Sequence, residues 1–155
     1  METTFIQGAT MIRQFRFAGL VVAGFLIAAQ SAFAADDPAG TWLTQAGDAK
    51  VKVAKCGGGL CGTVIWLKQP FDTDTGKPAT DSKNPNRELA TRPIIGLQLF
   101  ESMRADGPSR WSGRIYNADD GQSYDSHISV AGPDTLKVEG CVGSLCGGET
   151  WTRAK

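Results

Sequence analysis

The chain has 155 residues, of which 16 are basic and 16 are acidic, so its formal net charge is zero. This length suits a single domain with one modest core. Because there is no excess of basic side chains to neutralise phosphates, the composition argues against nucleic acid as a partner.

The first 34 residues have the pattern of a cleaved export signal. Arg13 and Arg16 form a basic flank, residues 18–29 are apolar and uncharged, and residues 31–34 read Ser-Ala-Phe-Ala, a small-x-small cleavage pattern. The apolar run is shorter than the roughly 20 residues that a membrane-spanning helix needs. We therefore predict cleavage after Ala34, a periplasmic or secreted protein with no membrane span after cleavage, and a single domain over residues 35–155.

Two segments with the same cysteine spacing predict two β-hairpins. Residues 56–61 read Cys-Gly-Gly-Gly-Leu-Cys, residues 141–146 read Cys-Val-Gly-Ser-Leu-Cys, and each is followed by glycine. The flanking residues have strand character, and the glycines permit the positive φ angles of tight turns.

An exported protein keeps its disulfides, and four cysteines allow three pairings. We predict Cys56 with Cys61 and Cys141 with Cys146, because cysteines facing each other across a hairpin meet the Cα separation of about 5.5 Å that the bond requires. A four-thiolate zinc site is the alternative, which the wide spacing and an oxidising compartment both disfavour. We expect no metal and no cofactor.

Segments with strand character follow one another through the rest of the chain, and none has the spacing of a substantial helix. They lie at residues 40–44, 50–55, 63–67, 93–100, 110–116, 124–130, 136–139 and 149–152. A polar loop at residues 68–91 follows the third strand and is long for so small a domain. The pattern predicts an all-β, eight-stranded antiparallel up-and-down barrel, since closure removes exposed edges; a β-sandwich is the alternative.

The two ends of this region read Gly40-Thr41-Trp42 and Trp151-Thr152-Arg153. They resemble the lipocalin-like (calycin) pattern, in which a Gly-x-Trp on the first strand is covered by an arginine from the last. It implies that Arg153 lies over the Trp42 ring and closes the barrel, with a cation–π attraction of about 0.5 to 2 kcal/mol.

A set of short motifs extends over almost the whole chain after the leader. They include Gly40-Thr41-Trp42, Leu60-Cys61-Gly62, Asp81 with Asn84-Pro85, Arg92-Pro93, Trp111-Ser112-Gly113-Arg114-Ile115-Tyr116-Asn117, Gly140-Cys141 and Trp151-Thr152-Arg153. With these motifs the chain resembles the bacterial exported family known as domain of unknown function 2147. The resemblance implies a lipocalin-like barrel and brings no catalytic activity with it.

Catalytic chemistry finds little support in the sequence. His127 and Asp125 share a strand face and form a candidate acid–base pair, but no serine or cysteine lies in a recognisable nucleophile motif. The run Asp72-x-Asp74-x-Gly76 is similar to part of a calcium loop, yet it lacks the bidentate glutamate. We predict that the protein is not an enzyme.

Aromatic side chains favour a binding role. An eight-stranded barrel either fills its interior with side chains or holds one small ligand. We predict a site for a small, partly apolar ligand with Trp66, Trp111 and Tyr124 on its wall and the loop from Gln69 to Arg92 as a lid. The alternative is a packed, non-catalytic barrel that serves as a structural or protein-interaction module, for which the sequence names no partner.

Overall fold

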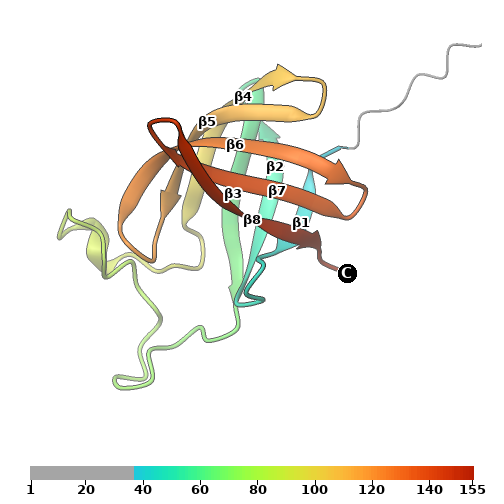
Figure 1. Ribbon diagram of the computed structural model, residues 1–155. Coiled ribbons are helices and arrows are strands. Elements are labelled where there is room, and N and C mark those ends of the chain that lie inside the picture. The colour runs from blue at the N-terminus through green and yellow to red at the C-terminus, as the bar shows by residue number, and fades with distance from the viewer. Residues whose placement is uncertain (1–36) are drawn as a thin grey trace, which may run out of the picture. The chain divides into compact units, whose positions relative to one another are not determined.

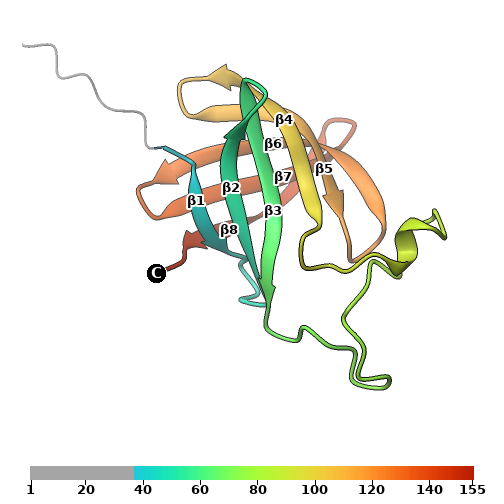
Figure 2. The same ribbon diagram turned by 180° about the vertical axis from the view of Figure 1, so that it is seen from behind.

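The computed structural model describes residues 37–155, which form an eight-stranded β-barrel (Figures 1 and 2). The predicted signal peptide and its cleavage site lie outside the described residues. The elements in chain order are β1 (Gly40–Leu43), β2 (Ala49–Cys56), β3 (Gly59–Leu67), the 3₁₀ helix η1 (Leu89–Thr91), β4 (Gln98–Gly107), β5 (Arg110–Asn117), β6 (Gln122–Gly132), β7 (Thr135–Val142) and β8 (Leu145–Arg153). Within this range no helix is long and apolar enough to span a bilayer.

Pairing between the first and last strands closes the barrel. Each strand pairs antiparallel with its sequence neighbour, and β1 pairs with β8 through Trp42 opposite Arg153 and Leu43 opposite Thr152. The predicted up-and-down barrel is therefore confirmed. The alternative β-sandwich is wrong, because a closed sheet does not separate into two layers.

Successive strands run in opposite directions, so their connections fall alternately at the two ends of the barrel. The β1–β2, β3–β4, β5–β6 and β7–β8 connections lie at one end, which we call the open end. The β2–β3, β4–β5 and β6–β7 turns lie at the other, which we call the packed end. The two cysteine hairpins consequently lie at opposite ends of the barrel.

Side chains from the inner faces of the strands fill the interior towards the packed end. The strands alternate inward apolar and outward polar residues, as in β2, where Val51 and Val53 are buried between lysines. The core consists of Trp42, Val51, Val53, Leu60, Phe100, Met103, Ile128, Leu136, Val138 and Trp151. Trp111 and Ile115 of β5 pack against it.

The fourth strand begins later than the sequence predicts. Residues 93–97 belong to the long loop, and β4 starts at Gln98. Pro93 has no amide hydrogen to donate, and Gly96 has a φ of 93°, so the backbone turns before it joins the sheet. Leu97 is the buried residue of this segment, and Gly96 and Leu97 exchange backbone hydrogen bonds with Val64.

Candidate ligand cavity

A cavity of about 1060 Å³ occupies the open end of the barrel. Its apolar wall includes Val64, Leu99, Ile115, Val138 and Trp151, which come from five different strands. Trp151 and Val138 also belong to the core, so the side of the core that faces the open end forms the floor of the cavity. Ligand sites in proteins are commonly about 300 to 1,000 Å³, so the volume lies just above that range.

Four connections form the mouth. The lining includes Thr44 to Ala49 in part, Lys68 and Gln69 after β3, residues 117–120 between β5 and β6, and Leu145 to Glu149 at the start of β8. The mouth thus combines apolar strand residues with polar turn residues, as in sites where a few polar groups orient an apolar ligand.

The tip of the β7–β8 hairpin contributes apolar side chains to this mouth. Val142 and Leu145 line the cavity although their side chains are 70% and 80% exposed. The disulfide between Cys141 and Cys146 joins the two strands directly behind them, with Cα atoms 4.1 Å apart. The bond joins the two strands at the tip that borders the mouth.

Two hydrogen bonds join aromatic groups of the cavity to carboxylates. The Tyr124 hydroxyl donates to Oδ2 of Asp120 at 2.7 Å, and the Trp151 indole N–H donates to Oε1 of Glu149. The hydrogen bond from Tyr124 lowers the pKa of Asp120, and the same bond raises the pKa of Tyr124. Asp120 therefore stays ionised and Tyr124 stays neutral at physiological pH.

The three predicted wall residues lie in three different places. Tyr124 lines the cavity. Trp111 lies in the interior at the packed end, beside a small space of about 270 Å³ that Lys55 and Leu60 also line. Trp66 is 39% exposed and lies on the outside of β3, where the Lys50 ammonium is 5.3 Å from its ring centroid.

A β-bulge explains the position of Trp66. Strict alternation from Val64 would turn Trp66 inward, but Val51 pairs with Val64 while Lys50 pairs with Trp66, so Ile65 is an extra residue in β3. The extra residue reverses the alternation. Leu67 turns inward in place of Trp66 and lines the cavity.

The long loop is held against the barrel and contributes little to the cavity. The fully buried Asp81 carboxylate accepts hydrogen bonds from Tyr116 Oη at 2.6 Å and from Asn84 Nδ2 at 2.9 Å, and Arg92 Nη2 lies 2.8 Å away. Burial, followed by the bond to Asp81, raises the pKa of Tyr116.

Only the ends of the loop reach the mouth. Among residues 69–92, the predicted lid, Gln69 alone lines the cavity. The hairpin in which Phe71 bridges to Pro78 projects away from the barrel, as Figure 2 shows. Within it, the Asp72 carboxylate accepts two hydrogen bonds from Thr75, which is the geometry of a local turn.

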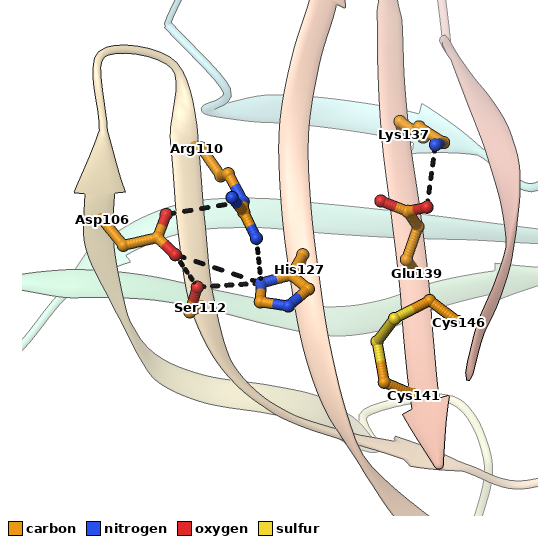
Figure 3. The surroundings of a disulfide bond; sticks show 8 residues. All are labelled: Asp106, Arg110, Ser112, His127, Lys137, Glu139, Cys141 and Cys146. Atoms are coloured by element: carbon orange, nitrogen blue, oxygen red, sulfur yellow. Dashed lines mark hydrogen bonds and ion pairs between the residues drawn. A yellow bond between two sulfur atoms is a disulfide. The ribbon is translucent and has the colours of Figure 1, made fainter. Parts of the chain in front are cut away.

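The proposed acid–base pair does not form. Asp125 is 3.4 Å from Arg114, whereas His127 Nδ1 is 2.9 Å from both Ser112 Oγ and Arg110 Nη2 (Figure 3). These side chains lie on the outer face of the barrel, opposite the inward Ile128. The cluster has no access to the cavity.

The packed end holds the other predicted residues. The Arg153 guanidinium carbon lies 4.3 Å from the centroid of the buried Trp42 ring, and Arg153 also donates to the carbonyl oxygens of Pro133, Ala39 and Asp37. Trp42 Nε1 donates to Pro38 at 2.8 Å. Together these contacts join the first residues, the last strand and the β6–β7 turn.

The structure pairs all four cysteines within their hairpins. Cys56 bonds to Cys61 and Cys141 bonds to Cys146, and within the described residues no cysteine is free. The disulfide prediction is thus confirmed.

Sequence reasoning missed the acidic residues of the cavity. Glu149 lies two residues before the buried Trp151 on β8, so strand alternation alone places it on the inner face. Asp120 directly precedes Gly121, a sequence typical of a turn, and it is four residues from Tyr124.

Comparison with known proteins supports the fold and leaves the ligand open. A family model described as "Uncharacterized protein conserved in bacteria (DUF2147)" matches residues 40–153. Among solved structures, the chain is similar to protein HP1028 from the human pathogen Helicobacter pylori, which is described as belonging to the lipocalin family. The two are 22% identical with a TM-score of 0.64, over 77% of this chain and 84% of that one. No curated protein matches the sequence.

Proposed function

Since the chain belongs to the bacterial DUF2147 family, a family with a lipocalin-like barrel, we propose that it binds or carries a small, partly apolar molecule in the cavity at its open end. The observation that carries this proposal is the cavity itself, about 1060 Å³ with an apolar wall and a polar mouth. A barrel that serves only as a structural or interaction module has no need of such a space.

We propose that the protein works outside the cytoplasm, as an exported component of the cell envelope. Two disulfides are compatible with an extracytoplasmic location, where such bonds persist. The leader pattern of residues 1–34 supports the same location.

The proposed role is non-enzymatic. Among the polar side chains of the lining, Tyr124 is bonded to Asp120 and Glu149 is bonded to Trp151. The histidine lies on the opposite face of the sheet, so no acid–base pair of the usual kind faces a bound molecule.

Filling the mouth tests the proposal. Gly147 lines the cavity, and a Cβ at this position would meet no atom within 4 Å. Gly147→Trp should therefore fold and place an indole in the mouth. Thr150→Trp, on the exposed outer face of the same strand, is the matched control.

Binding is measured with an apolar fluorescent probe and by native mass spectrometry of protein isolated from the envelope of its own host. We expect the unaltered protein and Thr150→Trp to bind the probe, and Gly147→Trp to lose most of the affinity. Equal binding by both variants, or no binding by the unaltered protein together with a bare mass, would contradict the proposal.

A further inference from the structure

We propose that the molecule held in the cavity is an amphiphilic cation, with an apolar body and a positively charged head such as an ammonium group. This inference rests on the proposed function and names the chemical class of its ligand. It follows from the charges of the residues that line the cavity and from where those charges lie.

The lining is strongly acidic although the chain as a whole is neutral. Its charged residues are Asp48, Lys68, Asp119, Asp120 and Glu149. Four carboxylates against one ammonium leave a formal charge of about −3 around one opening. A concave opening lined by one sign of charge attracts ligands of the opposite sign.

Within the described part of the chain, no lysine or arginine forms an ion pair with these four carboxylates. The seven ion pairs there involve other acids, such as Asp81 with Arg92 and Glu139 with Lys137. Three of these acids, Asp48, Asp120 and Glu149, instead accept hydrogen bonds from neutral donors, as when Thr44 donates to Asp48 at 2.6 Å. Their negative charge therefore remains available to a ligand.

Glu149 is the acid placed to contact a ligand inside the barrel. It lies on the inner face of β8, is partly buried and pairs across the sheet with the buried Val138. Its carboxylate accepts one hydrogen bond, from the Trp151 indole, although an ionised carboxylate has about four acceptor positions. The indole fixes one oxygen and leaves the other for a cationic group.

Aromatic rings complete a site for a positive charge. Tyr124 and Trp151 both line the cavity, and each is bonded to a carboxylate. The face of an aromatic ring attracts ammonium groups, including fully methylated ones that cannot donate hydrogen bonds. The apolar wall formed by Val64, Leu99 and Ile115 then takes the body of the ligand.

The same arrangement disfavours fatty acids and other anionic amphiphiles. A carboxylate head would meet the negative charges of the mouth, and the only basic side chain of the lining is Lys68. Selection against the wrong charge gives specificity in addition to affinity.

Three probes with the same apolar chain separate the effect of charge from the effect of apolar burial. They are decyltrimethylammonium, 1-decanol and decanoate, each titrated at neutral pH and below its micelle concentration, with affinity followed by calorimetry. The variants are Glu149→Gln, which keeps an acceptor for Trp151, and the control Glu139→Gln, on the outer face of β7 and 2.7 Å from Lys137.

We expect the cation to bind about tenfold more tightly than the neutral alcohol, as one partly exposed charge interaction allows, and decanoate to bind most weakly. The preference should shrink at high salt and be lost in Glu149→Gln, while Glu139→Gln retains it. Binding of 1-decanol should be the same in all three proteins.

Two results would overturn the inference. If the three probes bind equally, or if Glu149→Gln keeps the preference for the cation, the charge assignment is wrong and the proposed binding function stands. If none of the probes binds, the proposed function fails and this inference fails with it.

Discussion

The two disulfide hairpins have the same cysteine spacing and the same Leu-Cys-Gly ending, but they occupy opposite ends of the barrel. In the β2–β3 hairpin, Leu60 is 1% exposed and belongs to the core. In the β7–β8 hairpin, the corresponding Leu145 is 80% exposed and lines the mouth of the cavity. Both leucines lie on the inner face of a strand, so the difference comes from what the barrel contains at each end.

The following glycines show the same contrast. A side chain at Gly62 would overlap the ring of Phe100, which fills the barrel there. A side chain at Gly147 would meet no atom within 4 Å. Local sequence therefore determines the shape of a hairpin. Its position in the strand order determines the end of the barrel at which it lies, and so whether its tip packs against the core or borders the cavity.

Truncation of the two leucines gives the largest expected difference. Leu60→Ala should lower the free energy of unfolding by about 2 to 5 kcal/mol, because it leaves a cavity in a packed core. Leu145→Ala should change it by no more than about 0.5 kcal/mol, as an exposed substitution does. Urea unfolding measures both; equal losses would show that the open end is as well packed as the other.

Removal of the Asp81 carboxylate tests what stabilises the open end. Asp81→Ala leaves Tyr116, Asn84 and Arg92 without their acceptor. We expect a loss of about 3 kcal/mol, the lower limit for breaking a buried ion pair, because Arg92 is partly exposed. Proteolysis should then cut the long loop faster.

The exposed pair of Asp125 with Arg114 supplies the control for that variant. Asp125→Ala should cost no more than about 1 kcal/mol, as exposed ion pairs do. If the two variants lose equal stability, or if the loop of Asp81→Ala resists the protease, the loop is anchored by other contacts.

Removal of each disulfide should separate stability from binding. Replacing either pair of cysteines by serine should cost about 2 kcal/mol, since both close loops of the same length. Only loss of Cys141–Cys146 should also weaken binding of an apolar probe, by several-fold, because that bond fixes residues of the mouth. Equal binding by the two double variants would mean that the tip keeps its position without the bond.

The smallest expected effect concerns the two tyrosines of the chain. The pKa of each is raised above the ordinary value of 10.0. The chief cause is burial for Tyr116 and the hydrogen bond to Asp120 for Tyr124. In Tyr116→Phe, which isolates Tyr124 at the open end, adding Asp120→Asn should move the tyrosinate absorbance transition back towards pH 10. An unchanged transition would rule out that bond in solution.

The sign of the linkage to stability follows from these raised values. The contribution of each neutral tyrosine is fully present below about pH 10, the unfolded value. It is lost as the pH rises through the higher folded pKa, because the unfolded chain then ionises first. Stability measured above pH 10 should therefore fall less steeply in Tyr116→Phe.

Short-range patterns in the sequence predicted the barrel well. The cysteine spacing predicted both hairpins, and the motifs around Trp42 and Arg153 indicated which strands would meet. Alternation of apolar residues then assigned the inner face of most strands, including Ile128 of β6.

The details of the cavity were harder to predict. The bulge at Ile65 turns Trp66 outward, and no residue in that run marks it, since its cause is the pairing with β2. Trp111 does face the interior, but it lies at the packed end and not beside the cavity. Alternation predicts which face a residue is on and does not predict how far along the barrel it lies. The inward position of Glu149 was predictable, because it lies two residues from Trp151 on the same strand. An acidic side chain on an inner face is unusual and therefore indicates a binding or structural role.

The contacts of Arg153 also determine where a linker or a surface can be attached to the protein. By bonding to Asp37 and Ala39, this side chain holds the first described residues beside the end of β8, at the end remote from the mouth. A linker placed after Lys155 would therefore leave the entrance unobstructed. Immobilisation on a sensor chip through that terminus should preserve ligand access, whereas coupling through the β7–β8 tip should block it.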